Sequence, residues 1–477
     1  MQNISNKNNS IIKKPEVFLP KNGIDYNKWA VIACDQHTSP NSTYWEEVEK
    51  YVGDNPSTLK LIFPEYYLND KDNTEERINL IRKKMEEYLK DGIVEKFIYG
   101  NNGKGNFIYT RRKLSNNKIR QGLTVLLDLE KYSYKKGDKS PIRPTEGIVE
   151  ERLPIRIKIR EGAPLEFPHI LMLIDDPDKR IIEPLGDTLD KHHKLFDFDL
   201  MMGGGHIEGY AITSEKYENN IFSGLDRLSN SIEFSKRYGF DREEPAIVIA
   251  VGDGNHSLAS AKSIWEKTKK NLMENNEAWE NHPARYAMAE VVNIHDESLE
   301  FEPIHRVLFN IKDMDLFHKE IEEFYLNKGI GISIEQIEIS EEEYKNHSLI
   351  DNKFEEKIQE QETQMYWIMH KDMSEEKILT YTVTLNPGIH SITVGSLQLF
   401  LDDYLSRNND VEIDYIHGTE DLLNNLGVKS NVGFLLPGMN KSDLFKTVAK
   451  EGVTPRKTFS MGESDTKAYY IMGRKIS

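Results

Sequence analysis

The chain has 477 residues, of which 38% are apolar and 30% charged, and its formal net charge at pH 7 is −17. This length suffices for two or three domains with sizeable hydrophobic cores. The acidic balance disfavours broad electrostatic binding of nucleic acid or of an anionic membrane, but it permits a local basic pocket for a small anion.

The amino-terminal region carries no recognisable targeting signal. Residues 1–14 are rich in Asn, Ser and Lys, and we expect a disordered tail there. No apolar run approaches the length of a membrane span. The single cysteine, Cys34, excludes an intramolecular disulfide and a multi-cysteine zinc site. A cytoplasmic location is therefore expected, and the reactivity of Cys34 is left open.

Apolar patterning in the first half of the chain predicts both helices and strands. Helices are expected at 44–52 and 75–91, and the pattern at 214–228 is loosely helical. Strands are expected at 29–34, 107–111, 122–129, 154–160 and 168–176. The strand at 154–160 is inferred from its alternation of apolar and basic residues.

The second half continues this mixture. Helices are expected at 313–328, 397–405 and 441–450, and strands at 365–369, 378–384 and 469–472. The strongly charged segment 335–364 has few apolar anchors, so we expect a surface insertion. This mixture of predicted helices and strands indicates an α/β (α+β) fold with mixed sheets and helices. We divide it into the tail 1–14, an N-terminal α/β region 15–145, a central region 146–310 and a C-terminal region 311–477.

The segment 246–259 is the most informative candidate for a functional site. Residues 246–251 are apolar and four are β-branched, which predicts a buried strand. Gly252-Asp253-Gly254 then breaks the strand, and a helix is expected over 257–266 with Asn255 or Ser257 as its N-cap. Backbone N–H groups and the positive end of the helix dipole meet at such a turn, which suits phosphate. An ordinary capped strand–helix turn is the equal alternative.

Several familiar motifs are absent from the sequence. It contains no Walker-type phosphate loop, no Gly-x-Ser-x-Gly elbow, no His-Glu-x-x-His helix and no dinucleotide fingerprint. Gly203-Gly204-Gly205 could form an anion-binding nest, but a flexible loop is the favoured interpretation.

Two acidic groups are candidates for chemistry. Glu146 lies in a segment rich in arginine and glutamate, where an ionised carboxylate could act as a base or bind Mg²⁺, although composition favours a solvated charge run. Asp175 and Asp176 end an apolar strand and could bind a hard cation, or they could form a turn with Pro177.

Two basic groups are further candidates. His305 and Arg306 lie in an apolar setting, where a single histidine is more often structural than catalytic. Arg456 and Lys457 precede Thr458 and Ser460, and cations beside hydroxyl groups can clamp a phosphate. A basic turn before the last strand is the somewhat favoured alternative.

Taken together, the motifs resemble the domain-of-unknown-function 1015 family over almost the whole chain. The resemblance is specific for the family but much less so for an activity. It rests on Trp29–Ser39, Tyr44-Trp45, Pro56–Thr58, Thr145–Gly147, Glu151–Pro154, Leu200–His206, Gly252–Ala259, Ala284–Tyr286, Phe301–Arg306 and Pro455–Gly462.

This resemblance also implies a distant relation to a nucleotide-binding fold. The Asp-Gly-Asn-His-Ser segment is similar to the Asp-Gly-His-His/Thr-Arg segment of more typical members. That segment resembles the nucleotide-phosphate motif of the ParB/sulfiredoxin-like fold and of free serine kinases, which use a glutamate base. Ser257 stands where many relatives have Arg, so one phosphate-binding cation is missing and direct kinase transfer is in doubt.

The leading hypothesis is a nucleotide-dependent phosphotransferase that acts on a small hydroxylated metabolite such as serine. Glu146 would be the base, Asp253 would help to hold Mg²⁺, and His256 would donate to phosphate or move a proton. The phosphates of ATP or ADP would bind residues of the turn and of the basic segment near the C-terminus, with Asp175 as an additional metal ligand. The turn residues are Gly252, Gly254, Asn255 and Ser257, and the basic segment supplies Arg456, Lys457 and Thr458.

Two other hypotheses belong to different classes. A non-catalytic nucleotide or metabolite sensor would use the same ParB-like pocket as a ligand switch, as the missing arginine suggests. DNA association is disfavoured by the charge of −17 and by the absence of a helix-turn-helix signature. The sequence does not determine the phosphate donor or acceptor, and it leaves a homo-oligomer open.

Overall fold

The protein is described by a computed structural model that covers residues 10–33, 43–64, 66–67, 73–99, 105–372, 377–462 and 464–476. The fold is mixed α/β. The chain forms two compact units: the first comprises residues 1–299 and 461–477, and the second comprises residues 300–460. These limits differ from the divisions at 145 and 310 expected from sequence. The expected strand–loop junction at Cys34 lies outside the described residues.

The first unit contains fifteen of the named strands and eight of the named helices among the described residues. Its helices are α1 (Tyr26–Trp29), α2 (Tyr44–Val52), α3 (Thr74–Lys90), α4 (Leu153–Arg160), α5 (Glu183–Gly186), α6 (Glu215–Leu228), α7 (Ser231–Tyr238) and α8 (Asn255–Glu274). Its strands are β1 (Ile12–Lys13), β2 (Phe18–Pro20), β3 (Val31–Ile32), β4 (Val94–Lys96), β5 (Ile108–Lys113), β6 (Ile119–Asp128), β7 (Ile142–Arg143), β8 (Leu165–Glu166), β9 (Leu171–Ile174), β10 (His193–Asp199), β11 (His206–Ala211), β12 (Ile249–Asp253), β13 (Tyr286–Asn293), β21 (Tyr469–Tyr470) and β22 (Arg474–Lys475).

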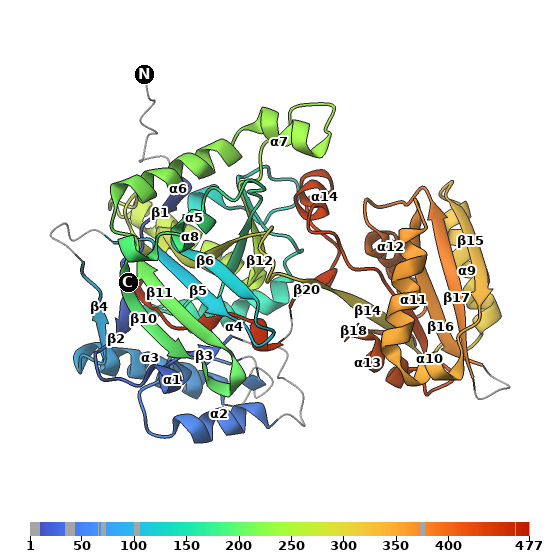
Figure 1. Ribbon diagram of the computed structural model, residues 1–477, viewed down its shortest axis with the longest axis horizontal. Coiled ribbons are helices and arrows are strands. Elements are labelled where there is room, and N and C mark those ends of the chain that lie inside the picture. Colours follow the sequence, from blue (N-terminus) through green and yellow to red (C-terminus); the bar gives the residue numbers. More distant parts are fainter. Residues whose placement is uncertain are drawn as a thin grey trace. The chain divides into compact units, whose positions relative to one another are not determined.

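A nine-stranded mixed sheet is the centre of this unit. Its order is β10-β11-β5-β6-β13-β9-β12-β7, and β1 also pairs with β6. Helices α1, α2 and α3 cover one face, and α5, α6 and α8 cover the other (Figure 1). Successive side chains of a strand point to opposite faces. In β6, accordingly, Leu123 and Val125 enter the core beneath α5, α6 and α8, whereas Leu126 enters the opposite core.

The second unit is built on a seven-stranded sheet of order β15-β17-β16-β19-β14-β18, with β20 also pairing with β14. The strands are β14 (Phe301–Phe309), β15 (Gly331–Ile337), β16 (Gln364–Lys371), β17 (Ile378–Asn386), β18 (Glu412–His417), β19 (Val432–Leu435) and β20 (Phe459–Met461). The helices are α9 (Met314–Leu326), α10 (Glu341–Lys345), α11 (His347–Gln359), α12 (Thr393–Arg407), α13 (Thr419–Asn425) and α14 (Asp443–Glu451). Helices α9 and α12 contribute to one core of the sheet, and α11 and α13 to the other.

The structure corrects three sequence expectations. Residues 154–160 lie in helix α4 rather than in a strand, with Pro154 in the first turn, where a proline is compatible with a helix. The charged segment 335–364 includes α11, whose buried Ile350 and Phe354 join a core, so it is not a surface insertion. In the expected tail, Ile12 is fully buried and pairs with Leu127 of β6.

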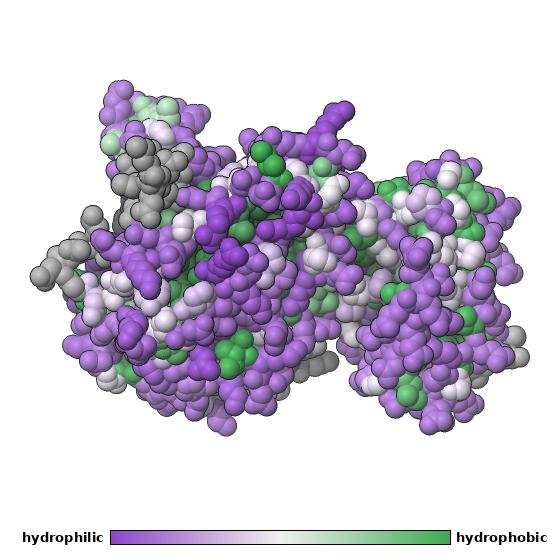
Figure 2. All heavy atoms as spheres, turned by 45° about the horizontal axis from the view of Figure 1, so that its top comes forward, coloured by the Kyte–Doolittle hydropathy of each residue, from purple (hydrophilic) through white to green (hydrophobic). Residues whose placement is uncertain are grey.

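The outer surface agrees with the charged composition. The face drawn in Figure 2 is mostly hydrophilic, with hydrophobic residues scattered over it. No helix within the described part of the chain is long and apolar enough to cross a membrane.

The second unit contains two buried histidines, His305 and His370, and the half-buried His318, and we expect acid to destabilise it for this reason. Burial lowers the pKa of His305 to about 3 and that of His318 to about 4, and it also lowers the pKa of His370. These side chains are neutral when folded at pH 7, whereas in the unfolded chain they take up protons as the pH falls below 6.5. The free energy of unfolding should therefore fall as the pH drops from 6.5 towards 4, and one pKa unit corresponds to about 1.4 kcal/mol.

This expectation is tested by hydrogen exchange of the β16 amides at pH 7.5 and at pH 5, corrected for the intrinsic rate of exchange. Protection should be lower at pH 5. The substitution His318→Phe keeps an aromatic ring beside Tyr381 and should reduce the pH dependence. Equal protection at both pH values would contradict the prediction.

Candidate functional site

The turn between β12 and α8 is shaped by two glycines. Gly254 is the N-cap of α8 and has φ of +86°, a left-handed conformation that glycine adopts without strain. A Cβ atom at Gly252 would lie only 2.7 Å from the Met461 methyl carbon. The expectation that Asn255 or Ser257 caps the helix is therefore wrong, because the cap is Gly254 and its conformation excludes most other residues.

Asn255 holds the turn to a neighbouring segment. Its side-chain oxygen accepts a hydrogen bond from the Thr145 N–H (3.2 Å), and its amide group donates to Thr145 Oγ1 (3.3 Å). The Thr145 hydroxyl in turn donates to the carbonyl of Val251, at 2.7 Å. The Asn255 side chain is buried. These contacts give the Asn255 amide a structural role, and its predicted role in binding phosphate stays a prediction.

His256 makes a second contact with the same segment. The backbone N–H of Val149 donates to His256 Nε2 over 3.1 Å, so Nε2 carries no proton and the neutral ring is protonated at Nδ1. Segment 145–149 is thus tied to the turn at both ends. Glu146, which is half-buried, lies between these two ties. Glu146, the predicted base, therefore lies in a segment that borders the turn.

Asp253 is ionised beside a buried lysine. Its Oδ2 atom lies 3.5 Å from Nζ of Lys467, and its Oδ1 accepts from the Gly254 N–H over 2.7 Å. Burial alone would raise the pKa of Asp253, but the charge of Lys467, the nearby His169 side chain and these hydrogen bonds hold its pKa below the usual value. Lys467 also donates to the Met461 carbonyl over 3.2 Å. The turn therefore has a cation beside it, although Ser257 stands where the resemblance implies an arginine.

His169 also contacts the turn. Its Nε2 atom lies 3.2 Å from Oγ of Ser257, and its ring packs edge-on against Tyr470. Sequence reasoning missed both His169 and Lys467. Neither residue lies in a motif that indicates phosphate chemistry, and both are far from residue 253 along the chain. Only folding brings them to the turn.

The first turn of α8 is electrostatically suited to an anion. The helix has twenty residues and starts without a side-chain cap, and it contains no acidic residue in its first turn. The N-terminus of such a helix carries a partial positive charge. Together with Lys467, this charge favours a negatively charged group at the turn. The arrangement can hold phosphate oxygens while Asp253 and Glu146 supply carboxylates.

The predicted phosphate clamp 456–458 belongs to the second unit. The guanidinium of Arg456 donates to the Tyr415 hydroxyl, with Nη2 at 2.6 Å, and the Thr458 hydroxyl donates to the Pro455 carbonyl over 2.7 Å. Arg306, which is fully buried, donates to the carbonyls of Arg456 and Lys457. The two basic motifs are therefore structural partners, because Arg306 of β14 holds the turn that carries Arg456 and Lys457. Phosphate binding by Arg456, Lys457 and Thr458 stays a prediction.

His305 has a structural contact as well. Its Nδ1 atom accepts a hydrogen bond from the Leu436 N–H over 3.2 Å, and the side chain is buried. This agrees with the sequence-based preference for a structural histidine.

Asp175 is paired with protein groups. Its carboxylate contacts His295 Nε2 (2.6 Å), Arg237 Nη1 (2.8 Å) and the Tyr238 hydroxyl. Burial opposes ionisation, but these hydrogen bonds lower the pKa of Asp175 to about 2. The described residues contain no group of three or more His, Cys, Asp or Glu side chains placed to hold a metal ion. A metal at Asp175 stays a prediction that this network does not support.

The loop Gly203–Gly205 is closely packed. A Cβ atom at Gly204 would lie 2.0 Å from the Tyr469 hydroxyl oxygen, and one at Gly205 would lie 2.0 Å from the Lys113 carbonyl oxygen. The Gly204 carbonyl accepts two hydrogen bonds from Arg112. Gly204 and Gly205 therefore permit neighbouring groups to approach closely, so this part of the loop is packed, whereas a flexible loop was favoured from sequence.

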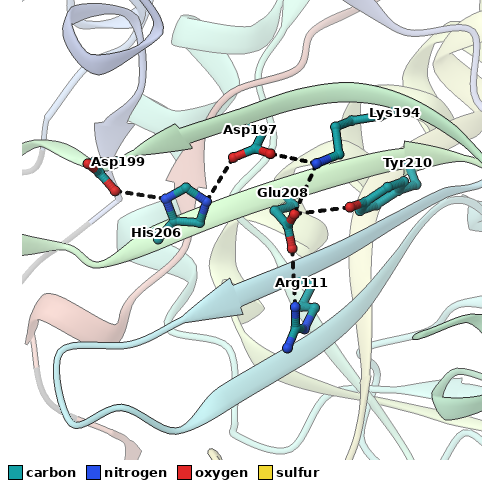
Figure 3. Close-up of polar contacts among 7 residues, drawn as sticks. All are labelled: Arg111, Lys194, Asp197, Asp199, His206, Glu208 and Tyr210. Atoms are coloured by element: carbon teal, nitrogen blue, oxygen red, sulfur yellow. Dashed lines mark hydrogen bonds and ion pairs between the residues drawn. The ribbon is translucent and has the colours of Figure 1, made fainter. Parts of the chain in front are cut away.

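A second polar cluster lies on β5, β10 and β11 (Figure 3). His206 is bound on both ring nitrogens, by Asp199 at 2.7 Å and by Asp197 at 2.9 Å. Lys194 links Asp197 to Glu208, and Glu208 also accepts from Arg111 and Tyr210. The charged side chains of this cluster form hydrogen bonds and ion pairs with one another. The cluster therefore joins three strands and is a weaker candidate site than the turn.

The comparisons with known proteins place the chain in a family. The family described as "Protein of unknown function (DUF1015)" matches residues 18–395. The chain belongs to this family. Membership in the DUF1015 family agrees with the resemblance inferred from the motifs, and its description assigns no activity. Among curated proteins, none matches the chain.

Some solved structures share a distant likeness with this DUF1015 protein. A conserved hypothetical protein from Pyrococcus furiosus has 12% identity and a TM-score of 0.34, covering 74% of this chain and 95% of that one. A free serine kinase variant in complex with ADP has 11% identity and a TM-score of 0.36, covering 75% and 93%. SbnI with C-terminal truncation from Staphylococcus aureus has 10% identity and a TM-score of 0.33, covering 73% and 85%. Likenesses at this level do not assign an activity.

Proposed function

We propose that the protein is a nucleotide-dependent phosphotransferase acting on a small hydroxylated metabolite such as serine. The observation that carries this proposal is the turn itself: an uncapped start of a long helix, with Lys467 beside it and a bordering segment that contains Glu146. A helix start and a cation together favour phosphate oxygens. The carboxylate of Glu146 is the general base of this proposal.

The proposed step transfers the terminal phosphoryl group of ATP. The acceptor hydroxyl oxygen forms a bond to the γ-phosphorus, and the bond between that phosphorus and the β–γ bridging oxygen breaks. ADP leaves with the electron pair of the broken bond. Glu146 takes the proton of the hydroxyl group. Lys467, through its charge, and Nδ1–H of His256 are the groups that would stabilise phosphate oxygens.

A magnesium ion would be held here mainly through nucleotide phosphates. Mg²⁺ commonly binds one or two protein carboxylates together with substrate phosphates, and Asp253 offers one such carboxylate at the turn. When bound, the ion would neutralise phosphate charge. Asp253 already contacts Lys467 through Oδ2 and the Gly254 N–H through Oδ1, so these contacts would compete with the ion for its carboxylate.

The first test is calorimetric titration of the purified protein with ATP and with ADP, each with and without Mg²⁺. We expect saturable binding that is at least tenfold weaker in the variant His256→Ala. His282 lies after α8 at a distance along the chain and makes its own cap contact, so His282→Ala is the matched control and should leave nucleotide affinity unchanged. No binding of either nucleotide would remove the proposal.

A non-catalytic sensor is the second candidate. Two observations favour it: Asp253 is already paired with Lys467, and Nε2 of His256 is already occupied by the Val149 N–H. A sensor would bind nucleotide but form no phosphorylated product. Incubation with radiolabelled ATP and a panel of hydroxylated metabolites, serine included, separates the two candidates, because any labelled product that depends on Glu146 ends the sensor proposal.

A further inference from the structure

An internal cavity lies within the first unit, on the face of the large sheet opposite α5, α6 and α8. Its volume is about 50 Å³. A water molecule needs roughly 10–15 Å³ on such a measure, so the cavity has room for about three waters or for a small oxyanion. Polar residues that line it include Thr110, Arg112, Arg120, Thr124, His169 and Glu290.

The two arginines of this cavity differ in how fully they are bonded. Arg112 donates to the carbonyls of Gly204, Asp465, Thr466 and Lys467, so its N–H groups already have acceptors. Arg120 donates through Nη1 to the Thr466 carbonyl over 2.7 Å. Its Nε–H is buried and has no hydrogen-bond acceptor within the described residues. Arg120 is only 5% exposed, so bulk water does not satisfy this donor.

An unpaired donor on a buried cation is energetically costly, which gives the cavity a preference for an acceptor with negative charge. Among the lining residues, two arginines face one carboxylate, that of Glu290, which accepts from the Thr110 hydroxyl. Burial lowers the pKa of Arg120, while the charges of Glu290, Asp296 and Asp253 raise it. The carboxylates of Asp253 and Asp296 do not line the cavity, so the lining keeps a formal excess of one positive charge.

We propose that this cavity binds a small oxyanion, with Arg120 as the principal binding residue. The oxyanion is a carboxylate or a phosphate group, since both accept hydrogen bonds from a guanidinium in its plane. The Thr124 hydroxyl lies on the strand of Arg120, four residues away and on the same face, and supplies a further donor. His169 lines the cavity and also contacts Ser257, so the oxyanion site adjoins the turn. The proposal does not depend on nucleotide binding at that turn.

Calorimetric titrations without nucleotide test the proposal and distinguish the two oxyanions. The wild-type protein is titrated with sodium phosphate and separately with sodium acetate, with chloride keeping the ionic strength constant. We expect one oxyanion to bind saturably with a stoichiometry of one, and its affinity to fall at least tenfold in Arg120→Met. Arg111 adjoins Arg112 on β5, but its side chain pairs with Glu208 on the opposite face. Arg111→Met is therefore the control and should bind within twofold of wild type.

Each outcome decides the proposal. Saturation by phosphate alone identifies a phosphate group, and saturation by acetate alone identifies a carboxylate. Saturation by neither, or unchanged affinity in Arg120→Met, overturns the proposal. If Arg120→Met does not fold, crystal structures of the wild-type protein grown with and without each anion replace it. Oxyanion density within hydrogen-bond distance of Arg120 supports the proposal, and water alone in the cavity overturns it. Nucleotide binding could fail independently of these results.

Discussion

Replacing Glu146 with glutamine is expected to slow phosphoryl transfer by orders of magnitude while leaving nucleotide affinity unchanged. The amide keeps the size of the side chain but cannot take a proton from the acceptor hydroxyl group. General-base catalysis typically contributes about 10²- to 10⁴-fold to a rate, so turnover should fall by about this factor. The ties that hold segment 145–149 to the turn are made by Thr145 and Val149, and this substitution does not alter them.

Two measurements check this prediction on the same protein preparation. The rate of labelled product formation is compared with the affinity for ATP measured by calorimetry. Glu150 follows in the same region and is exposed, so Glu150→Gln is a control that should retain both properties. Full turnover in Glu146→Gln would disprove the assignment of the base. A parallel loss of nucleotide affinity would indicate that Glu146 has a structural role.

Replacing Glu166 with glutamine is expected to destabilise the first unit by about 3–5 kcal/mol, the usual cost of leaving a buried charge without its partner. Glu166 contacts the guanidinium groups of Arg160 and Arg474 and accepts from the Met288 N–H. Burial lowers the pKa of each arginine to about 9, and the charge of Arg474 also lowers the pKa of Arg160. Without the carboxylate, the buried Arg474 and the half-buried Arg160 remain without their shared anionic partner.

Urea denaturation followed by tryptophan fluorescence measures this effect. Trp367 is the only tryptophan in the sequence of the second unit, so the signal comes mainly from the first. Glu161→Gln is the control, because Glu161 pairs with Lys267 at the surface and such exposed pairs contribute about 1 kcal/mol or less. A loss below about 1 kcal/mol in Glu166→Gln would show that solvent or nearby groups compensate for the missing charge.

Local sequence patterns predicted those elements whose conformation depends on neighbouring residues. The helix at 44–52 was expected with the limits that α2 has, and the strand at 378–384 lies within β17. The strand prediction from apolar periodicity was wrong at 154–160. Alternating apolar and basic residues are also compatible with a short helix, and this one has a proline in its first turn. Periodicity also failed at α11, whose two buried residues, Ile350 and Phe354, are four positions apart and give only a weak pattern.

For the candidate site, the sequence determined which segment matters, and the tertiary structure decided which side chains stand beside it. Gly252, Asp253 and Gly254 predict a strand–helix turn because glycine backbone preferences and β-branched patterning act locally. Lys467 and His169 come to this turn from distant parts of the chain, and Arg120 is buried by the same assembly. Such placements depend on the pairing of strands and on the packing of segments far apart in sequence. Local sequence patterns do not predict these placements. The pairing of Asp253 with Lys467 and the unpaired Nε–H of Arg120 could therefore be found only in the folded protein.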